Sequence, residues 1–302
     1  MSRWAELGYQ AGWRLVRSVP APVVARAFRA AADHAARRDG PGTRQLRRNL
    51  ARVVPEAGPA ELDDLVRRGL RSYARYWREA FRLPAVDHRA LHREVDPHVA
   101  GQSHLDAALA AGRGAIVALP HSGNWDVAGV WLVGHSGRFT TVAERLRPES
   151  LYRRFVAYRE SLGFEIVPLT GGDARVHEVL AQRLRDNRVV CLLADRDLTS
   201  SGVGVRLFGG ATSMPSGPAR LAAATGAALL PVGSHFAPGG WRLRIHPEVA
   251  CGPSRVAAVT QALADVFAAD IAARPEDWHM LQPLWLDDLP EHRRVALSGR
   301  AG

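Results

Sequence analysis

A histidine and an aspartate five residues apart give the clearest chemical signal in this sequence. The run Leu119-Pro120-His121-Ser122-Gly123-Asn124-Trp125-Asp126 follows an apolar segment and leads into an expected helix. A carboxylate that accepts one ring N–H fixes the tautomer of an imidazole and leaves its other nitrogen free as a general base. Ligands of α/β proteins usually bind where strands end. We therefore predict that His121 acts as a general base and that Asp126 orients it and stabilises the imidazolium.

The same residues also allow a purely structural interpretation. Ser122 or Asn124 could cap the helix, Asp126 could be a first-turn acid favoured by the helix dipole, and His121 could be an ordinary loop residue. Spacing alone does not decide between the two interpretations.

A second segment, Gly134-His135-Ser136-Gly137-Arg138, is similar to the nucleophile elbow of serine hydrolases. That elbow requires G-x-S-x-G on a strand-to-helix turn, but position 138 is arginine and the segment follows an expected helix. We interpret it as the end of that helix, which disfavours a serine hydrolase.

Composition excludes further chemistries. Apolar residues make up 47% and charged residues 23% of the 302 residues, which is typical of a folded globular protein. All 40 basic residues are arginine. The chain therefore has no Walker-type phosphate loop and no lysine for a Schiff base. Its two cysteines cannot form a disulfide framework, and the scattered histidines lack metal-ligand spacing, so we predict no metal site. His279 beside Trp278 is interpreted as structural.

The net charge of +10 is concentrated near the N-terminus. Residues 1–52 contain 11 arginines and three acids, a net charge of +8, and residues 53–302 contribute the remaining +2. An anionic partner is implied, either a phospholipid surface or nucleic acid. Nucleic acid is disfavoured because no recognition motif accompanies the charge.

Residues 3–17 are predicted to form a helix that combines apolar residues with an arginine stripe. Such a helix is suited to an anionic membrane interface, although an ordinary amphipathic helix packed on the domain would show a similar pattern. Arginines interrupt any signal-peptide core, and no stretch reaches the roughly 20 apolar residues of a membrane span. We expect an intracellular protein that is not integral to a membrane.

The periodicity of the chain predicts an α/β fold with a mixed central sheet flanked by helices and preceded by a helical N-terminal region. Residues 1–100 form the helical region, 101–290 the α/β core and 291–302 a loose tail. Expected strands are Ala115–Leu119, Phe139–Ala143, Phe164–Leu169, Val189–Ala194, Val203–Phe208, Leu229–His235 and Arg242–His246. Expected helices of the core lie near 123–135, 148–162, 173–187, 216–226 and 254–273.

The His121-x4-Asp126 box resembles the H-x4-D/E box of the bacterial lipid A and lysophospholipid acyltransferase superfamily. Further ordered segments match as well, from the N-terminus almost to the end of the chain, and within the superfamily they are most similar to actinobacterial phosphatidylinositol mannoside acyltransferases. These segments are residues 7–17, 73–84, 141–146, 151–155, 159–163, 194–198, 208–209, 214–219 and 277–283.

The resemblance implies transfer of a long-chain acyl group, palmitoyl for example, from acyl-CoA to a mannose hydroxyl of a membrane glycolipid. Acyl-CoA would be a co-substrate, and no cofactor is required. His121 would deprotonate the attacking hydroxyl, Asp126 would orient it, and the thioester carbonyl would become an oxyanion held by backbone N–H groups or water. The protein would lie at the cytoplasmic face of the cell membrane as a peripheral protein.

The resemblance also implies substrate-binding roles for Glu144, Arg159 and Asp195. Related proteins often have glutamate where this chain has Asp195, which affects the expected acceptor preference. Two alternatives remain open: an acyltransferase acting on another membrane lipid, such as a lipid A precursor or a lysophospholipid, and a non-catalytic membrane-binding relative.

Overall fold

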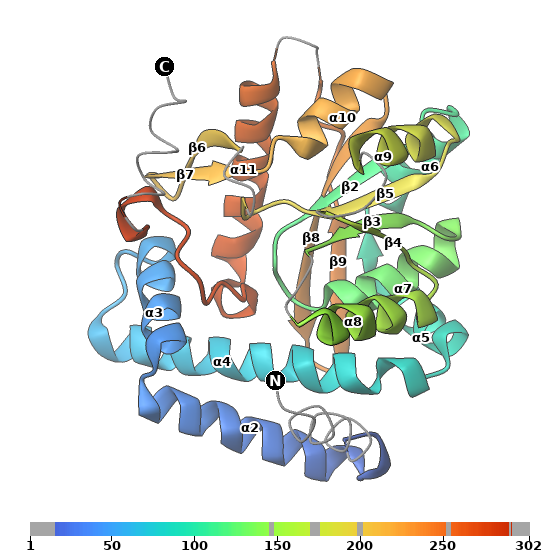
Figure 1. Ribbon diagram of the computed structural model, residues 1–302. Coiled ribbons are helices and arrows are strands. Elements are labelled where there is room, and N and C mark those ends of the chain that lie inside the picture. Colours follow the sequence, from blue (N-terminus) through green and yellow to red (C-terminus); the bar gives the residue numbers. More distant parts are fainter. Residues whose placement is uncertain are drawn as a thin grey trace.

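Helices alternate with mostly parallel strands along the greater part of the chain (Figure 1). The computed structural model describes residues 16–144, 148–169, 176–197, 202–251, 255–289 and 291. The helices are α2 (Ala21–Arg38), α3 (Pro41–Val53), α4 (Pro59–Arg82), α5 (His88–Val95), α6 (Gln102–Ala110), α7 (Trp125–Ser136), α8 (Glu149–Ser161), α9 (Val176–Arg185), α10 (Gly217–Thr225) and α11 (Val256–Ala273). The strands are β1 (Val99–Ala100), β2 (Ala115–Leu119), β3 (Thr140–Ala143), β4 (Glu165–Pro168), β5 (Val189–Leu193), β6 (Val203–Leu207), β7 (Gly210–Met214), β8 (Ala228–Ala237) and β9 (Gly240–Ile245).

A seven-stranded sheet with the order β1-β9-β8-β2-β5-β3-β4 forms the centre. Every neighbouring pair in it is parallel except β8 and β9, which form an antiparallel hairpin. The predicted mixed sheet is confirmed. Two strands, β1 and β7, were not expected. The expected strand β6 is present but lies outside the central sheet. It pairs with β7 in a separate antiparallel ribbon, which packs against α11.

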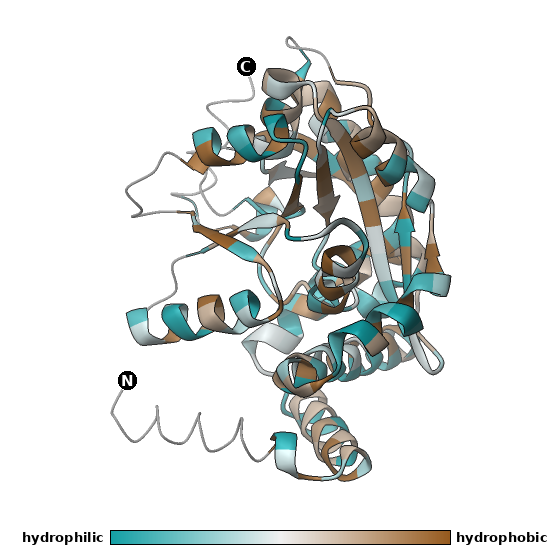
Figure 2. Cartoon of the chain, turned by 90° about the vertical axis from the view of Figure 1, so that its right-hand side faces the viewer, coloured by the Kyte–Doolittle hydropathy of each residue, from teal (hydrophilic) through white to brown (hydrophobic). Residues whose placement is uncertain are grey.

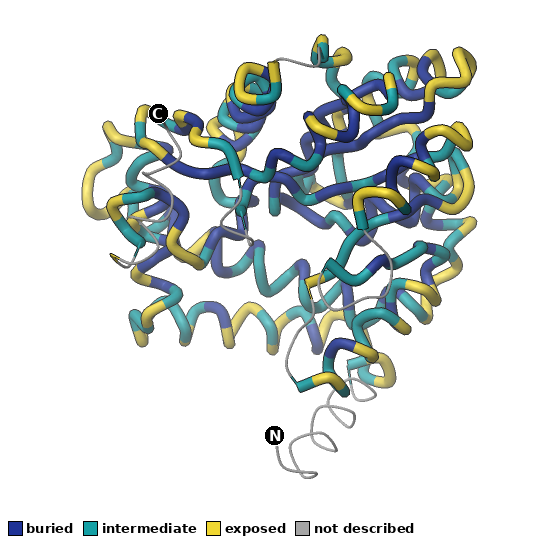
Figure 3. The backbone as a smooth tube through the Cα atoms, turned by 45° about the horizontal axis from the view of Figure 1, so that its top comes forward, coloured by how far each residue is buried: buried dark blue, intermediate teal, exposed yellow. Residues whose placement is uncertain are grey.

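Both faces of the sheet are covered, which explains why its central strands are almost continuously apolar. On β2, Ile116 and Ala118 belong to a core cluster formed with α9, α10 and α11, whereas Ala115, Val117 and Leu119 belong to a second cluster formed with α5, α6 and α7. Figure 2 shows hydrophobic residues dominating the central strands. Figure 3 shows the same strands buried and the outer faces of the helices exposed.

The N-terminal helices form a separate layer at one side of the sheet. Pro41 and Pro59 occupy the first turns of α3 and α4, where the missing N–H of proline costs no hydrogen bond. A third core cluster joins α2, α3 and α4. The guanidinium of Arg71 on α4 also bonds both carboxylate oxygens of Asp33 on α2, at 2.6 and 2.8 Å. The expected helix at 3–17 and the tail from 292 lie outside the described residues, apart from positions 16 and 17.

Within the part of the chain that the structure describes, one helix is long and apolar enough to cross a membrane by length and composition. This is α11, Val256–Ala273. Its buried apolar residues, Leu263 and Phe267 among them, belong to the core cluster on one face of the sheet. The helix therefore packs as a core element of the α/β fold, although no apolar stretch of this length was predicted.

The segment considered for a hydrolase elbow is the end of a helix, as predicted. Helix α7 ends at Ser136, and Gly137 follows with φ 80° as its C-cap. A strand-to-helix turn carrying an exposed serine is absent from this position.

Candidate active site

The loop that follows β2 carries His121, and its backbone is held on both sides. The N–H of Ser122 donates to the carbonyl of Pro120 (2.8 Å), and that of Gly123 donates to the carbonyl of Asp277 (2.9 Å). The carbonyl of His121 accepts from the N–H of His279 (2.8 Å). The C-terminal segment thus fixes the position of the loop.

The imidazole of His121 is bonded to Asp195, not to Asp126. Its Nδ1 lies 2.5 Å from Oδ1 of Asp195, and its backbone N–H donates to Oδ2 of the same carboxylate (2.9 Å). The expectation that Asp126 orients the ring is therefore corrected. The physical reason is the sheet register: β2 and β5 are parallel with Leu119 opposite Leu193, and His121 and Asp195 each lie two residues beyond these positions.

Asp195 is an ionised carboxylate in a fully buried place. Its side chain also accepts from the indole N–H of Trp278 (3.0 Å), so three donors surround it. Burial alone would raise its pKa, but the electrostatic interaction with His121 and the hydrogen bonds from His121 and Trp278 outweigh burial and leave the pKa of Asp195 below its ordinary value. Because an ionised carboxylate only accepts, His121 carries its proton on Nδ1 and presents Nε2 as the free basic nitrogen.

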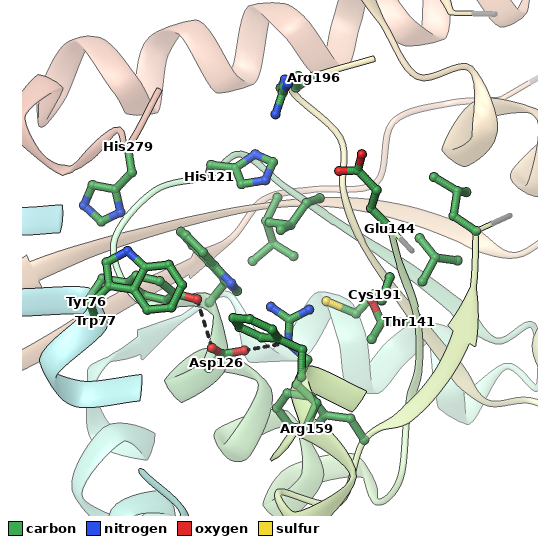
Figure 4. A pocket seen from close by; sticks show the side chains of 18 of the residues that line it. Tyr76, Trp77, His121, Asp126, Thr141, Glu144, Arg159, Cys191, Arg196 and His279 are labelled. Carbon is green, nitrogen blue, oxygen red and sulfur yellow. Dashed lines mark hydrogen bonds and ion pairs between the residues drawn. The ribbon is translucent and has the colours of Figure 1, made fainter. Parts of the chain in front are cut away.

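Asp126 lies at the first turn of α7 and is the centre of a separate buried cluster. Its Oδ1 accepts from Nε of Arg159 (3.2 Å), and its Oδ2 accepts from the hydroxyls of Tyr76 (3.1 Å) and Tyr158 (3.2 Å). Burial and the negative charge of Asp126 raise the pKa of both tyrosines, which stay protonated donors. The carboxylate therefore ties α7 to α4 and α8. Figure 4 shows these bonds from Asp126 to Tyr76 and Arg159.

A cavity of about 320 Å³ lies in front of His121, within the range of small-molecule sites. Its walls come from α4, the loop after β2, the ends of β3 and β5, α8 and the segment after α11. Besides His121, Asp126 and Arg159, its lining residues include Tyr73, Tyr76, Trp77, Leu119, Trp125, Phe139, Val142, Glu144, Phe155, Phe164, Cys191, Leu193, Arg196, His279 and Met280.

The structure brings the predicted site residues together around this cavity, but they do not all line it. His121, Asp126, Glu144 and Arg159 all line it, whereas Asp195 supports His121 from behind. Glu144 is exposed directly after β3 and lines the same cavity as His121 and Arg196, all three labelled in Figure 4. Arg159 was expected to bind substrate, but in this structure its guanidinium is bonded to the carboxylate of Asp126.

Three groups of the site were missed or given no role by the sequence. Arg196 lines the cavity directly after Asp195. The aromatic residues of α4 form another wall, and His279, interpreted as structural, also lines the cavity. The matching segments 73–84, 194–198 and 277–283 contained these residues, but nothing in their spacing indicated that they face His121.

Cys191 also lines the cavity but is not prepared as a nucleophile. Burial raises the pKa of its thiol to about 12, so the thiol stays protonated at neutral pH. Among the described residues there is no cluster of three or more His, Cys, Asp or Glu side chains that could hold a metal ion.

Comparison with known proteins places the chain in a family. The family model described as bacterial lipid A biosynthesis acyltransferase matches residues 1–287. The chain belongs to this family, and it is an acyltransferase.

Two similar curated proteins are both named phosphatidylinositol mannoside acyltransferase. The protein of Mycolicibacterium smegmatis is 62% identical over 294 residues, covering 97% of this chain and 95% of that protein. The protein of Mycobacterium tuberculosis strain H37Rv is 58% identical over 297 residues, covering 98% of this chain and 92% of that protein.

Proposed function

We propose that this acyltransferase moves a long-chain acyl group, palmitoyl for example, from acyl-CoA to a mannose hydroxyl of a phosphatidylinositol mannoside. The names of the two relatives support the acceptor. The observation that carries the chemistry is the His121 ring, which faces the cavity while Asp195 holds its Nδ1.

The proposed reaction is a direct transfer. Nε2 of His121 takes the proton of the sugar hydroxyl while the hydroxyl oxygen attacks the thioester carbonyl. The tetrahedral oxyanion then collapses, the carbon–sulfur bond breaks, and the imidazolium returns the proton to the departing CoA sulfur. Asp195 stabilises the imidazolium between these steps, as the carboxylate of a catalytic triad does. No covalent acyl-enzyme is needed, in agreement with the protonated thiol of Cys191.

The oxyanion requires a donor, and the loop amides are already engaged. The N–H groups of residues 121, 122 and 123 each donate to a partner within the protein. We assign the stabilising charge to Arg196, a cation that lines the same cavity as His121; both are labelled in Figure 4. Glu144 is assigned to the sugar hydroxyls, because it reaches the cavity as an exposed carboxylate.

The acyl chain has an apolar route next to the base. The main cavity is walled largely by aromatic and aliphatic side chains. A smaller apolar cavity of about 20 Å³ adjoins it and shares Leu119, Trp125 and Cys191 with it. If the acyl chain enters and widens this small cavity, the thioester lies beside His121.

The acceptor is a membrane lipid, and we place the protein at the cytoplasmic face of the membrane as a peripheral protein. Helix α2 supports this location, since Arg26, Arg29, Arg37 and Arg38 are all exposed on it. Such a basic surface is attracted to anionic lipid headgroups.

The test is acyl transfer from palmitoyl-CoA to mono- and dimannosylated phosphatidylinositol, followed by mass spectrometry, for the wild type and for His121→Ala. We expect a product from the wild type and a loss of at least about 100-fold in the variant. Binding of both proteins to anionic liposomes, measured by sedimentation, is the control for docking. If the wild type acylates a lipid A precursor or a lysophospholipid but no mannoside, the proposed acceptor is wrong. Equal transfer by the variant would remove His121 as the base.

A further inference from the structure

Two buried polar atoms in the wall of the reaction cavity have no hydrogen-bond partner among the described residues. They are the indole N–H of Trp125 and Nδ1 of His279. Both residues line the cavity together with His121. Buried polar groups are nearly always satisfied in native proteins, so an unsatisfied pair in a substrate cavity points to a ligand group that completes it.

The other side of the His279 ring is firmly bonded, and these bonds determine its tautomer. Nε2 lies 2.9 Å from the hydroxyl oxygen of Ser72, and that hydroxyl lies 2.6 Å from Oδ1 of Asp277. A carboxylate accepts, so the hydroxyl proton of Ser72 belongs to Asp277, and Ser72 can only accept from His279. Nε2 is therefore protonated and Nδ1 bears a lone pair.

The carboxylate of Asp277 is itself held in place from the sheet. Its Oδ2 accepts from the backbone N–H of Phe236 on β8 (2.8 Å), while its Oδ1 faces Ser72 on α4. Ser72, Asp277 and His279 are all buried. A relay of three side chains thus connects α4, β8 and the segment after α11, and its end is the Nδ1 lone pair.

Trp125 and His279 are complementary to each other. The indole N–H can only donate, and Nδ1 in this tautomer can only accept. Their rings lie 6.0 Å apart, and the ring of Trp125 lies 5.5 Å from that of His121, measured between centroids. Figure 4 shows the His279 and His121 rings among the side chains that line this cavity. A hydroxyl both donates and accepts, and therefore matches such a pair.

We propose that Trp125 and His279 form a hydroxyl-recognition subsite for the sugar of the acceptor, in which Nδ1 of His279 accepts the proton of a non-reacting hydroxyl and the indole N–H of Trp125 donates to an acceptor oxygen. The proposal rests on the function proposed above and specifies the substrate class as a sugar that carries at least one further hydroxyl besides the one acylated. Asp277 and Ser72 act as positioning residues, because they impose the tautomer.

His279 serves recognition in this assignment, whereas His121 serves proton transfer. Burial, with a smaller contribution from the charge of His121, lowers the pKa of His279 to about 3. A nitrogen of such low basicity accepts a hydrogen bond without taking the proton. The two histidines of one cavity therefore have different tasks.

The tautomer is the first test. In Asp277→Asn the amide oxygen would accept from Phe236 and the amide NH₂ would donate to Ser72, whose hydroxyl would then donate to Nε2 of His279. This reverses the tautomer and turns Nδ1 into a donor. ¹⁵N chemical shifts of histidine-labelled protein should show Nε2–H for His279 in the wild type and Nδ1–H in the variant. A wild-type ring protonated on Nδ1 would overturn the proposal without any variant.

The second test is discrimination among acceptors, measured with mannosides that lack one hydroxyl each. We expect the wild type to prefer the parent sugar over one of these deoxy analogues by at least about tenfold in kcat/KM. His279→Phe should abolish that preference and raise KM for the parent acceptor, with KM for acyl-CoA unchanged. The exposed His98 gives the control His98→Phe, in which the preference should persist.

The outcomes separate the two proposals. A wild type that transfers to no mannoside contradicts the proposed function. A wild type that transfers, combined with an unchanged deoxy preference in His279→Phe, contradicts only the subsite. If His279→Phe fails to fold, Asp277→Asn provides the same kinetic comparison, because reversing the tautomer should also abolish the preference.

Discussion

Nδ1 of His121 lies 2.5 Å from Oδ1 of Asp195, although 74 positions separate the two residues in the chain. Each residue stands two positions beyond a pair of opposing leucines at the ends of β2 and β5. The contact is thus a product of parallel strand register, whereas Asp126, five residues from His121, bonds to a different set of groups. Asp195 therefore orients the base, whereas Asp126 anchors α7.

The exchange of Asp195 for asparagine should therefore impair catalysis strongly. The amide cannot stabilise an imidazolium, and it favours the wrong tautomer of His121, so kcat should fall by at least about 100-fold. Asp195→Glu keeps the charge and should retain much more activity. Steady-state kinetics of both variants, with thermal unfolding as the check on folding, measures the effect. Equal losses in the two variants would contradict a role of the charge.

Asp126 should matter first for stability. Its buried carboxylate pairs with Arg159, whose side chain is 19% exposed, so Asp126→Leu leaves a largely enclosed guanidinium unpaired and should cost up to about 3 kcal/mol of unfolding free energy. The double variant Asp126→Leu/Arg159→Met should recover part of this loss, because the charge is then removed as well. Urea denaturation of the single and double variants gives the coupling energy. Strictly additive losses would show that the pair is not coupled.

The sequence predicts where the helices and strands of this fold lie along the chain better than it predicts which of them are neighbours in space. All seven expected strands occur, and Ala115–Leu119 has the predicted bounds, because a strand buried on both faces is a short apolar run between loops. The order of strands is not encoded in such local patterns. Asp195 was recognised as lying at a strand end, yet its pairing with His121 depends on β5 being the neighbour of β2.

The missed residues of the site show the same limit. His279 lies in an irregular segment after α11, where no periodicity assigns a face, and its partner Ser72 is 207 positions away. Trp77 and Tyr76 follow the apolar pattern of α4 whether they face a core or a cavity. Their functional position results from packing between helices and the sheet edge, which no window of the sequence contains.

Glu165 provides a prediction about acid stability. Hydrogen bonds from Arg183, opposed by burial and assisted by Thr140, lower the pKa of Glu165 from 4.5 to about 2. Since the folded protein has the lower pKa, the unfolded chain binds more protons between these values, and the stabilisation is complete above pH 4.5 and lost as pH falls towards 2. Glu165→Gln should lower the free energy of unfolding at pH 7 by about 1 kcal/mol, and by less at pH 3.

Urea denaturation of the wild type and Glu165→Gln at several values between pH 3 and pH 7 tests this. The difference between the two proteins should shrink on acidification. A difference that stays constant with pH would mean that the variant acts by packing and that the carboxylate charge contributes nothing measurable.

Gly123 permits a test of how closely the His121 loop is fitted to its surroundings. The residue has φ 60°, and a Cβ at this position would lie 2.6 Å from Oγ and 2.8 Å from backbone atoms of Ser234. Gly112 has a similar φ of 70°, with nothing within 4 Å of its Cβ position. Both alanine variants therefore carry the strain of a positive φ, about 1 kcal/mol or more, whereas only Gly123→Ala must also displace the loop from the sheet.

Since His121 is two residues away and depends on a hydrogen bond to Asp195, Gly123→Ala should lose activity by at least about tenfold more than Gly112→Ala. Parallel measurement of kcat and of the thermal midpoint separates the two effects, and equal activities in the two variants would show that the loop can shift without moving the base.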